Sequence, residues 1–261
     1  MIWVEMMGPS GIGKSYWYKY LTKKYWHITL EGVLSRYAQM AYTDLSRRGK
    51  LKYIIKGLGV LPQKYHKGLR DEVVRAAIRK HGKLQPIAGD RLSQDDIRKY
   101  LDVLWRSNAQ LRDPIRRIKM VSHVLNKRLP KFMAVDRLSQ GKEIVVFEGG
   151  ILHNNRGITK EYVDDWPEAL VPDFILRLIA RDEYIYTNRK KRISSGGGTF
   201  IERGVPPKEL QKMARQASLR YTEKVTLLDK KGANILDVNV MLRDENVRDT
   251  IDRHMYHILA Q

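Results

Sequence analysis

Short apolar runs recur along the chain, and most of them are separated by stretches with the period of an amphipathic helix. Five of these runs predict core strands, at residues 2–7, 26–30, 143–147, 174–180 and 233–238. Strands that alternate with helices are typical of a parallel sheet with helices on both faces. The pattern therefore predicts an α/β protein with a five-stranded parallel sheet in a three-layer fold.

The interval between the second and third predicted strands is too long for one crossover helix, so we expect several helices there. Ser93 and Asp96 have the spacing of a capping box, which marks a helix start. The apolar stripe behind this start consists of Ile97, Tyr100, Leu101 and Leu104. Residues 69–81 have a weaker helical pattern, and residues 56–68, which include Gly57, Gly59 and Pro62, predict a loop.

A further helix in this interval is predicted to begin at Asp113 and Pro114, since these residue types are preferred at the N-cap and the first helical position. The positions expected to face inward are Ile115, Ile118, Val121 and Leu125. The remaining positions include Arg116, Arg117, Lys119, His123 and Lys127.

The positive charge of the chain is concentrated in the same interval. The net charge is +20, and residues 32–142 alone contain 26 Lys or Arg and 9 Asp or Glu, a balance of +17. A basic block of this size predicts an anionic partner, which could be a phosphorylated substrate, a nucleic acid or an anionic lipid surface. We therefore distinguish a basic helical insertion, residues 32–142, from a core formed by residues 1–31 and 143–261.

Composition excludes several classes of site. The chain has no cysteine, which excludes disulfides, thiolate zinc sites and cysteine nucleophiles, and its seven histidines lack metal-ligand spacing. No apolar run approaches the roughly 20 residues of a membrane span. The chain enters a predicted strand almost at once, so no secretory signal is expected. We expect a cytoplasmic protein, for which peripheral membrane contact stays open.

A glycine-rich loop, residues 8–15, follows the first predicted strand and has the spacing G-x-x-x-x-G-K-[ST]. Backbone N–H groups in such a loop, and the start of the next helix, bind phosphate groups. Lys14 is expected to reach the β- and γ-phosphates, and Ser15 to bind Mg²⁺. The residues predicted to contact the nucleotide here are Gly8, Ser10, Gly11, Ile12, Gly13, Lys14 and Ser15.

Two glutamates follow predicted strands. Glu148 comes directly after residues 143–147, and Glu31 after residues 26–30. A carboxylate at the carboxyl end of a strand can hold Mg²⁺ or accept a proton from an attacking hydroxyl. Either glutamate fits either role, and the choice stays open. Asp44 and Asp90 are weaker alternatives, because nothing places them at a strand end.

An arginine-rich segment follows the fourth predicted strand and leads into a glycine-rich stretch, residues 194–199. Its cationic side chains are those of Arg177, Arg181, Arg189, Lys190, Lys191 and Arg192. Such a segment, over about residues 181–204, is typical of a lid that closes on a triphosphate and stabilises charge in the transition state.

Taken together, these features resemble the nucleoside and nucleoside-monophosphate kinases, in particular the deoxynucleoside and thymidylate kinases. The resemblance covers the loop at residues 8–15, the arginines at 189–192, the run Glu202-Arg-Gly-Val-Pro206 and the run Ile235-Leu-Asp-Val-Asn239. It implies a P-loop kinase that uses ATP and Mg²⁺, with Arg189 and Arg192 as lid arginines. It also implies that Asp237, Val238 and Asn239 lie near the adenine. Glu148-Gly149-Gly150 departs from the family's E-R-S pattern, because the nearest following arginine is Arg156.

The leading hypothesis is a kinase that transfers the γ-phosphate to a hydroxyl or phosphate of a small anionic acceptor, such as a nucleotide, a sugar phosphate or a phosphorylated glycolipid precursor. Candidate acceptor-binding residues in the insertion are Arg36, Arg47, Arg116 and Arg117.

Two other hypotheses use the same basic insertion. One is a polynucleotide 5′-hydroxyl kinase or nucleic-acid-dependent NTPase, in which aromatic residues stack on bases. The aromatics concerned are Tyr37, Tyr42, Tyr53, Tyr65, Tyr100 and Trp105. The other is a nucleotide switch or a protein that docks on anionic lipid. The oligomeric state stays open.

Overall fold

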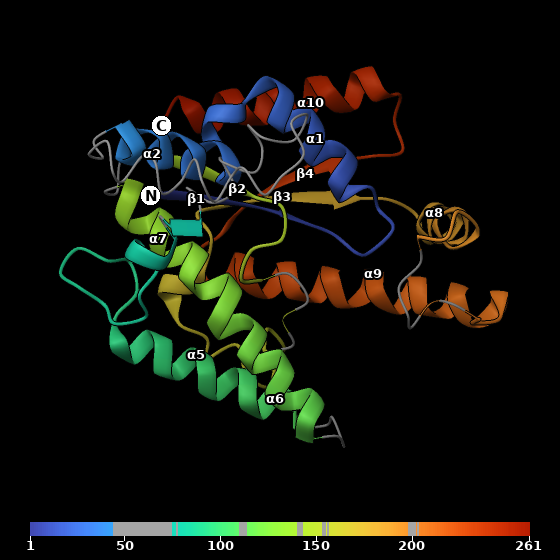
Figure 1. Ribbon diagram of the computed structural model, residues 1–261. Helices are drawn as coiled ribbons and strands as arrows, with labels where there is room; N and C mark the ends of the chain where they lie inside the picture. The colour runs from blue at the N-terminus through green and yellow to red at the C-terminus, as the bar shows by residue number, and fades with distance from the viewer. Residues whose placement is uncertain are drawn as a thin grey trace. The chain divides into compact units, whose positions relative to one another are not determined.

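The computed structural model describes residues 1–43, 75–76, 78–109, 114–139, 143–152, 155, 157–197, 202 and 204–261 (Figure 1). The predicted loop at residues 56–68, Asp44 and Arg47 lie outside these residues. Of the weak helix predicted at residues 69–81, residues 75–76 and 78–81 are described and are helical. No helix in the described part of the chain is long and apolar enough to cross a membrane.

Four strands form one parallel sheet, which confirms the α/β class. They are β1 (Ile2–Met7), β2 (Ile144–Phe147), β3 (Phe174–Ile179) and β4 (Asn234–Asn239). Their order is β2-β1-β3-β4. Met7 lies opposite Arg177, and Arg177 lies opposite Asp237. Because β3 and β4 stay paired beyond this row to Ile179 and Asn239, they continue past the end of β1.

The second of the five predicted strands, at residues 26–30, is wrong. A 3₁₀ turn covers Trp26–Ile28, and helix α2 (Leu30–Thr43) begins two residues later. Thr29 explains the difference, because its Oγ1 accepts a hydrogen bond from the backbone N–H of Gly32 at 3.2 Å. This is the bond of an N-cap residue, and it starts a helix where the alternation of apolar residues indicated a strand.

The chain divides into two compact units. The helical unit comprises Met1–Ile2 and Tyr25–Val145, and the sheet unit comprises Trp3–Lys24 and Val146–Gln261. The sequence-based division placed the borders at residues 31/32 and 142/143 instead.

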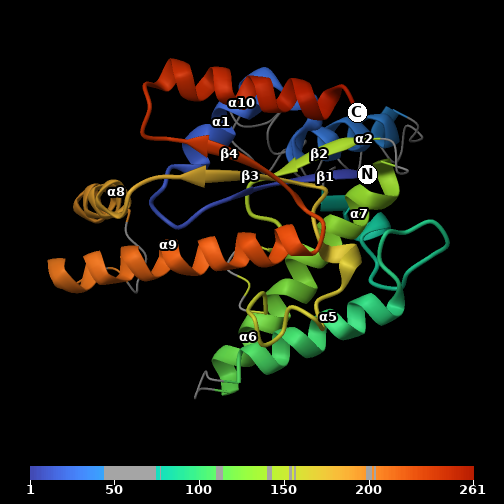
Figure 2. The same ribbon diagram turned by 180° about the vertical axis from the view of Figure 1, so that it is seen from behind.

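The sheet unit has helices on both faces of its strands. Helices α1 (Lys14–Lys24) and α10 (Asp244–Leu259) lie on one face, and α9 (Pro207–Lys230) lies on the other (Figures 1 and 2). Helix α8 (Asp182–Ser194) follows β3 and contacts α9. The core of the unit is apolar and includes Val4, Met6, Ile175, Leu176 and Leu228, all almost fully buried. These layers hold the carboxyl ends of β1, β3 and β4 at one edge.

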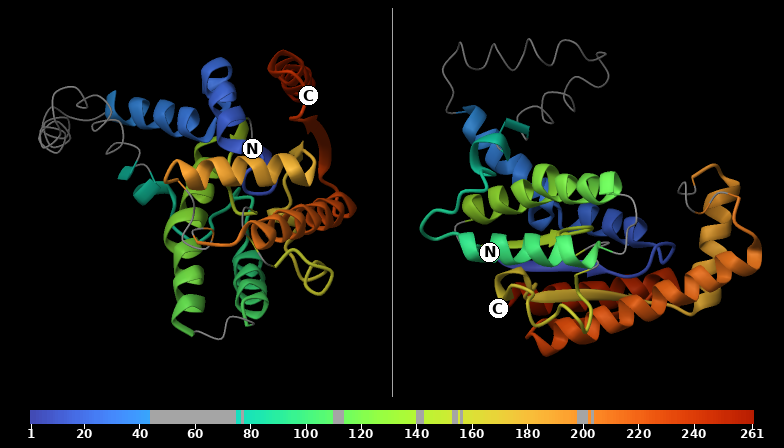
Figure 3. Two further views of the ribbon diagram at one scale, coloured as in Figure 1. Left: turned by 90° about the vertical axis from the view of Figure 1, so that its right-hand side faces the viewer. Right: turned by 90° about the horizontal axis from the view of Figure 1, so that it is seen from below.

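The helical unit is built from α2, α5 (Gln94–Ser107), α6 (Pro114–His123) and α7 (Leu129–Ser139). Helix α5 runs alongside the helix that contains α6 and α7 (Figure 3). The capping box at its start is confirmed, since Ser93 Oγ accepts from the Asp96 backbone N–H at 3.1 Å and Asp96 Oδ2 accepts from the Ser93 backbone N–H at 2.9 Å. The predicted stripe is also buried, except for half-buried Leu101.

The inward orientation expected for Ile115 and Ile118 is wrong, because their exposed fractions are 63% and 55%. A π-helical segment, Val124–Arg128, joins α6 to α7 without a break. A π-helical turn accommodates one residue more than an α-helical turn. Leu129, Phe132 and Met133 of α7 are buried, whereas α6 contacts α5 through Arg117 and leaves Ile115 and Ile118 exposed.

Candidate functional site

The glycine-rich loop connects the end of β1 to the start of α1 in the sheet unit. Gly11 and Gly13 have φ angles of +94° and +99°, a region that favours glycine. A Cβ on Gly11 would lie 2.8 Å from Cγ of Arg189 and 3.0 Å from the carbonyl oxygen of Ile185. Helix α8 is therefore packed directly against the loop, and Gly11 makes this approach possible.

Lys14, the first residue of α1, folds back over its own loop. Its Nζ donates hydrogen bonds to the carbonyl oxygens of Gly8 at 2.5 Å and Pro9 at 3.2 Å. Burial lowers the pKa of Lys14 to about 8; the cations Arg189 and Arg192 also lower it, whereas Glu148 opposes the shift. A bound anion would raise the pKa of Lys14 again, because a nearby negative charge stabilises the ammonium form.

Ser15 and Glu148 are brought together, as expected for residues predicted to bind one cation. The Ser15 hydroxyl donates to Glu148 Oε1 at 2.5 Å, and Glu148 directly follows β2. The described residues contain no cluster of three or more carboxylates or histidines that could hold a metal by themselves. A magnesium ion here would draw on the Ser15–Glu148 pair, water and phosphate oxygens, as Mg²⁺ commonly does.

Helix α8 sends three side chains onto the loop. Arg189 Nε donates to the carbonyl oxygen of Ser10 at 2.8 Å, and both terminal nitrogens of Arg192 lie 3.2 Å from Ser10 Oγ. Asn188 Nδ2 donates to the carbonyl oxygen of Gly11 at 3.0 Å. Both arginines predicted for a lid therefore contact the glycine-rich loop. The sequence reasoning missed Asn188, although it lies beside Arg189 and one turn before Arg192.

Glu202 holds these two arginines. Its buried carboxylate lies 2.5 Å from Nη2 of Arg192 and 3.7 Å from Nε of Arg189. Burial lowers the pKa of Arg189, and Glu202 counteracts that effect. The sequence pointed to Glu202 only through the resemblance, and the structure connects it to the loop through Arg192.

Two groups of predicted nucleotide-binding residues have other partners within the sheet unit. Arg181 precedes α8, its side chain is exposed, and its backbone N–H donates to Met241 Sδ at 3.1 Å. Asp237 forms a double hydrogen bond with Arg177, at 2.5 Å for each pair of atoms. Residues 237–239 belong to β4, which ends one residue later than the strand predicted at residues 233–238.

Several candidates of the helical unit have structural partners. Arg36 bonds to Glu143 at 2.6 Å, and Arg117 donates to the carbonyl oxygen of Trp105 at 2.7 Å. Asp90 is paired with Arg137 at 2.7 Å.

Glu31 is exposed in the first turn of α2, so its expected position at a strand end is wrong. The cap formed by Thr29, which follows the 3₁₀ turn, places it on a helix instead of after a strand.

Two charged residues that the sequence reasoning missed lie close to the segment after Glu148. Glu5 of β1 is fully buried, and a Cβ on Gly150 would lie 2.8 Å from its Oε2. Lys224 of α9 is buried and donates to the carbonyl oxygens of Leu152 at 3.3 Å and Asn155 at 2.6 Å. The available signal was a charge within an apolar stripe, since Lys224 lies beside Val225 and one turn before Leu228.

Comparison of the chain with models of protein families and with curated proteins gives no match.

Proposed function

We propose that the protein is an ATP-dependent kinase that transfers the γ-phosphate to a hydroxyl or phosphate of a small anionic acceptor. One observation carries the proposal: Lys14, the Ser15–Glu148 pair and Arg192 converge on one glycine-rich loop at the carboxyl end of a parallel sheet. This edge is where open α/β sheets bind ligands.

The residues of the loop fit a triphosphate and its cation. Lys14 can exchange its bonds to the Gly8 and Pro9 carbonyls for bonds to phosphate oxygens. The negative charge of the phosphate would stabilise the charged form of its partly buried ammonium group. Bound magnesium neutralises charge on the phosphates. Ser15 and Glu148 are the residues that we assign to it, and Glu148 is also the carboxylate that we assign as proton acceptor.

Arg192 is the residue that we assign to charge stabilisation during transfer. Its guanidinium is partly exposed and reaches the hydroxyl of Ser10, so a phosphate bound by the loop would lie within its range. Arg189 is buried and bonded to the backbone of Ser10, so we assign it to holding the loop in place. Arginine contacts of the first kind typically contribute large factors to phosphoryl transfer.

The acceptor is inferred to be anionic because residues 32–142 carry a net charge of +17. A polynucleotide 5′-hydroxyl is the second candidate acceptor, favoured by the same charge. Its binding would weaken steeply with salt, whereas binding of a small phosphorylated acceptor would depend on salt much less.

The test is a screen with labelled ATP and Mg²⁺ against nucleosides, nucleotides, sugar phosphates, phosphorylated glycolipid precursors and RNA with a free 5′-hydroxyl. Wild type is compared with Lys14→Ala and Glu148→Gln, and with Lys19→Ala as a control, because Lys19 lies on α1 but is exposed. We expect transfer to fall by about 100-fold or more in the first two variants and to persist in the third. Unchanged transfer by Lys14→Ala would overturn the proposal.

A further inference from the structure

Three large apolar side chains lie exposed near the junction of α5 and α6. They are Trp105 at the end of α5, which is 44% exposed, and Ile115 and Ile118 at the start of α6. Arg117 connects the two helices at this point, with its guanidinium carbon 3.8 Å from the centre of the Trp105 ring. We call Trp105, Ile115 and Ile118 the docking face.

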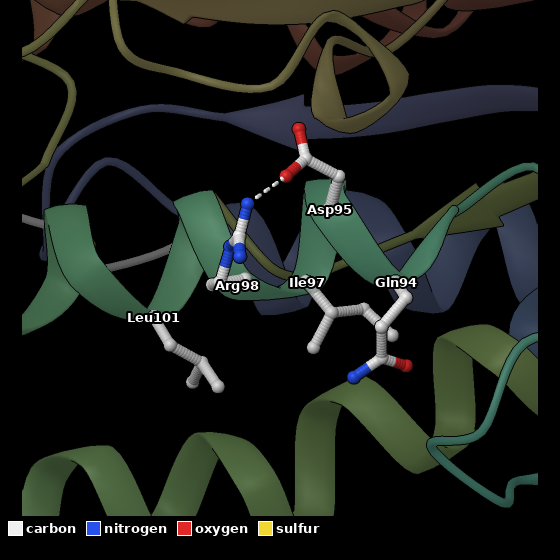
Figure 4. Close-up of a pocket in the computed structure, with 5 residues that line it drawn as sticks. All are labelled: Gln94, Asp95, Ile97, Arg98 and Leu101. Carbon is white, nitrogen blue, oxygen red and sulfur yellow. Dashed lines mark hydrogen bonds and ion pairs between the residues drawn. The ribbon is translucent and has the colours of Figure 1, made fainter.

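A hollow of about 590 Å³ lies beside α5, over the part of the helix that precedes Trp105. Ile97 and Leu101 line it and point from α5 toward the neighbouring helix, as Figure 4 shows. Leu101 lies one helical turn before Trp105, so the two share one side of α5. The polar residues of the hollow are Gln94, Asp95 and Arg98.

The surroundings of the docking face are strongly basic. Residues 114–135 contain six Lys or Arg and no Asp or Glu. Lys119, Lys127 and Lys131 are exposed. Burial lowers the pKa of His123, and so do the nearby cations Arg128, Lys127 and Lys131, which indicates that these charges are clustered.

Acidic residues of α5 do little to offset this charge. Asp95 pairs with Arg98 at 2.6 Å and with Lys99 at 2.9 Å, and Asp102 pairs with Arg106 at 2.8 Å. Helix α5 carries three carboxylates, of Asp95, Asp96 and Asp102, and three cations, of Arg98, Lys99 and Arg106, so it has no net negative charge to compensate the charge of the α6–α7 helix.

We propose that the docking face binds the surface of an anionic phospholipid membrane, with its apolar side chains in the interface and the lysines among the headgroups. Aliphatic and aromatic side chains bordered by lysines are typical of helices that lie in a membrane interface.

A nucleic acid fits this surface less well. Isoleucines add nothing to phosphate recognition, and Arg117 already covers one side of the Trp105 ring. The proposal is independent of phosphoryl transfer, and its test needs no nucleotide.

The experiment is co-sedimentation of the full chain with phosphatidylcholine vesicles that contain or lack phosphatidylglycerol, over a range of salt concentrations. We expect binding only to the anionic vesicles, and weaker binding at high salt. The double variant Ile115→Ser/Ile118→Ser should bind about tenfold more weakly. Lys119→Ala and Lys127→Ala should each lower the affinity for anionic vesicles about fivefold.

Ile87→Ser is the matched control, because Ile87 is also 63% exposed in the helical unit but precedes α5. It should bind like wild type. Tryptophan fluorescence gives a second readout: the change on adding anionic vesicles should vanish in Trp105→Phe and persist in Trp26→Phe.

Three results would overturn the proposal. The first is absence of binding to anionic vesicles at low salt, and the second is an equal loss of binding in Ile87→Ser. The third is an RNA complex, or a dimer of the chain, that depends on Ile115 and Ile118 while vesicles do not bind.

Discussion

The ammonium group of Lys14 has a pKa close to neutral pH. Burial lowers its pKa to about 8 in the absence of nucleotide, so it is mostly charged at neutral pH and mostly neutral above that value. Only the charged form attracts phosphate strongly, and a bound triphosphate would raise the pKa again. Proton uptake and nucleotide binding are therefore coupled in the proposed kinase.

We expect the affinity for a non-hydrolysable ATP analogue to be constant below about pH 7 and to fall about tenfold between pH 7 and pH 9, as Lys14 loses its proton. Isothermal titration calorimetry across this range measures it. Lys14→Arg should abolish the pH dependence, because arginine stays protonated. An identical decline in Lys14→Arg would assign the titration to another group.

Substitution of the two arginines that contact the loop should have different effects on activity and stability. Arg192→Lys should lower kcat by about tenfold or more with little change in Tm, because lysine keeps a cation beside the buried Glu202 carboxylate but loses the two guanidinium contacts to Ser10. Arg189→Ala should lower Tm as well, since it removes a buried group from between Ser10 and Glu202. Lys190→Ala is the control on the same helix and should change neither kcat nor Tm. Equal loss of Tm in both arginine variants would contradict the division of roles.

At the scale of elements, the turn at Trp26–Ile28 is packed against α2 without room for a side chain at Gly32. A Cβ there would lie 1.7 Å from the carbonyl oxygen of Trp26. Helix propensity alone favours alanine over glycine by about 1 kcal/mol. Whether Gly32→Ala raises or lowers the free energy of unfolding therefore shows which is larger, the clash with Trp26 or the gain in helix propensity.

Gly32→Ala should decrease the free energy of unfolding by about 3 kcal/mol, because the backbone of the turn must move. Gly89→Ala is the comparison: Gly89 has a φ of +91° but open space around it, so only the strain of the backbone, about 1 kcal/mol, is expected. Urea titration followed by circular dichroism measures both. A Gly32→Ala protein more stable than wild type would contradict this packing.

The strands that the sequence predicts correctly, such as β1 and β3, are short apolar runs that are buried in the sheet. Their apolar composition alone is enough to indicate them. At residues 26–30 a short apolar run predicted a strand, but Trp26, Ile28 and Leu30 fit a turn that leads into a helix equally well, and Thr29 caps that helix. The exposure of Ile115 and Ile118 was also out of reach, since apolar periodicity does not encode which side chain of α6 contacts α5. The partners of Glu202 and Lys224 depend on tertiary contacts, which local patterns do not encode.

At the scale of the molecule, the charge is divided very unevenly along the chain. Residues 32–142 carry +17 of the +20, whereas the glycine-rich loop and its arginines belong to the sheet unit. Donor and acceptor of the proposed reaction are both anionic, so electrostatic attraction would speed the capture of each.

We expect activity to fall about tenfold or more when the existing phosphate of the best acceptor is removed, because a charged contact with arginine or lysine is lost. Steady-state kinetics with the acceptor and its dephosphorylated form measure this, and KM should carry most of the change. The rate of ATP hydrolysis without acceptor serves as control. Equal turnover of the two forms would contradict an anionic acceptor.

The π-helical turn at Val124–Arg128 has a consequence for how this protein could change over generations. Loss of a single codon within it would restore a regular helix, because a π-helical turn accommodates one residue more than an α-helical turn, and the faces of α6 and α7 would keep their present relative orientation. Ile115 and Ile118 would then stay exposed. The turn is thus a place where one residue can be gained or lost without a change in the docking face or in the glycine-rich loop.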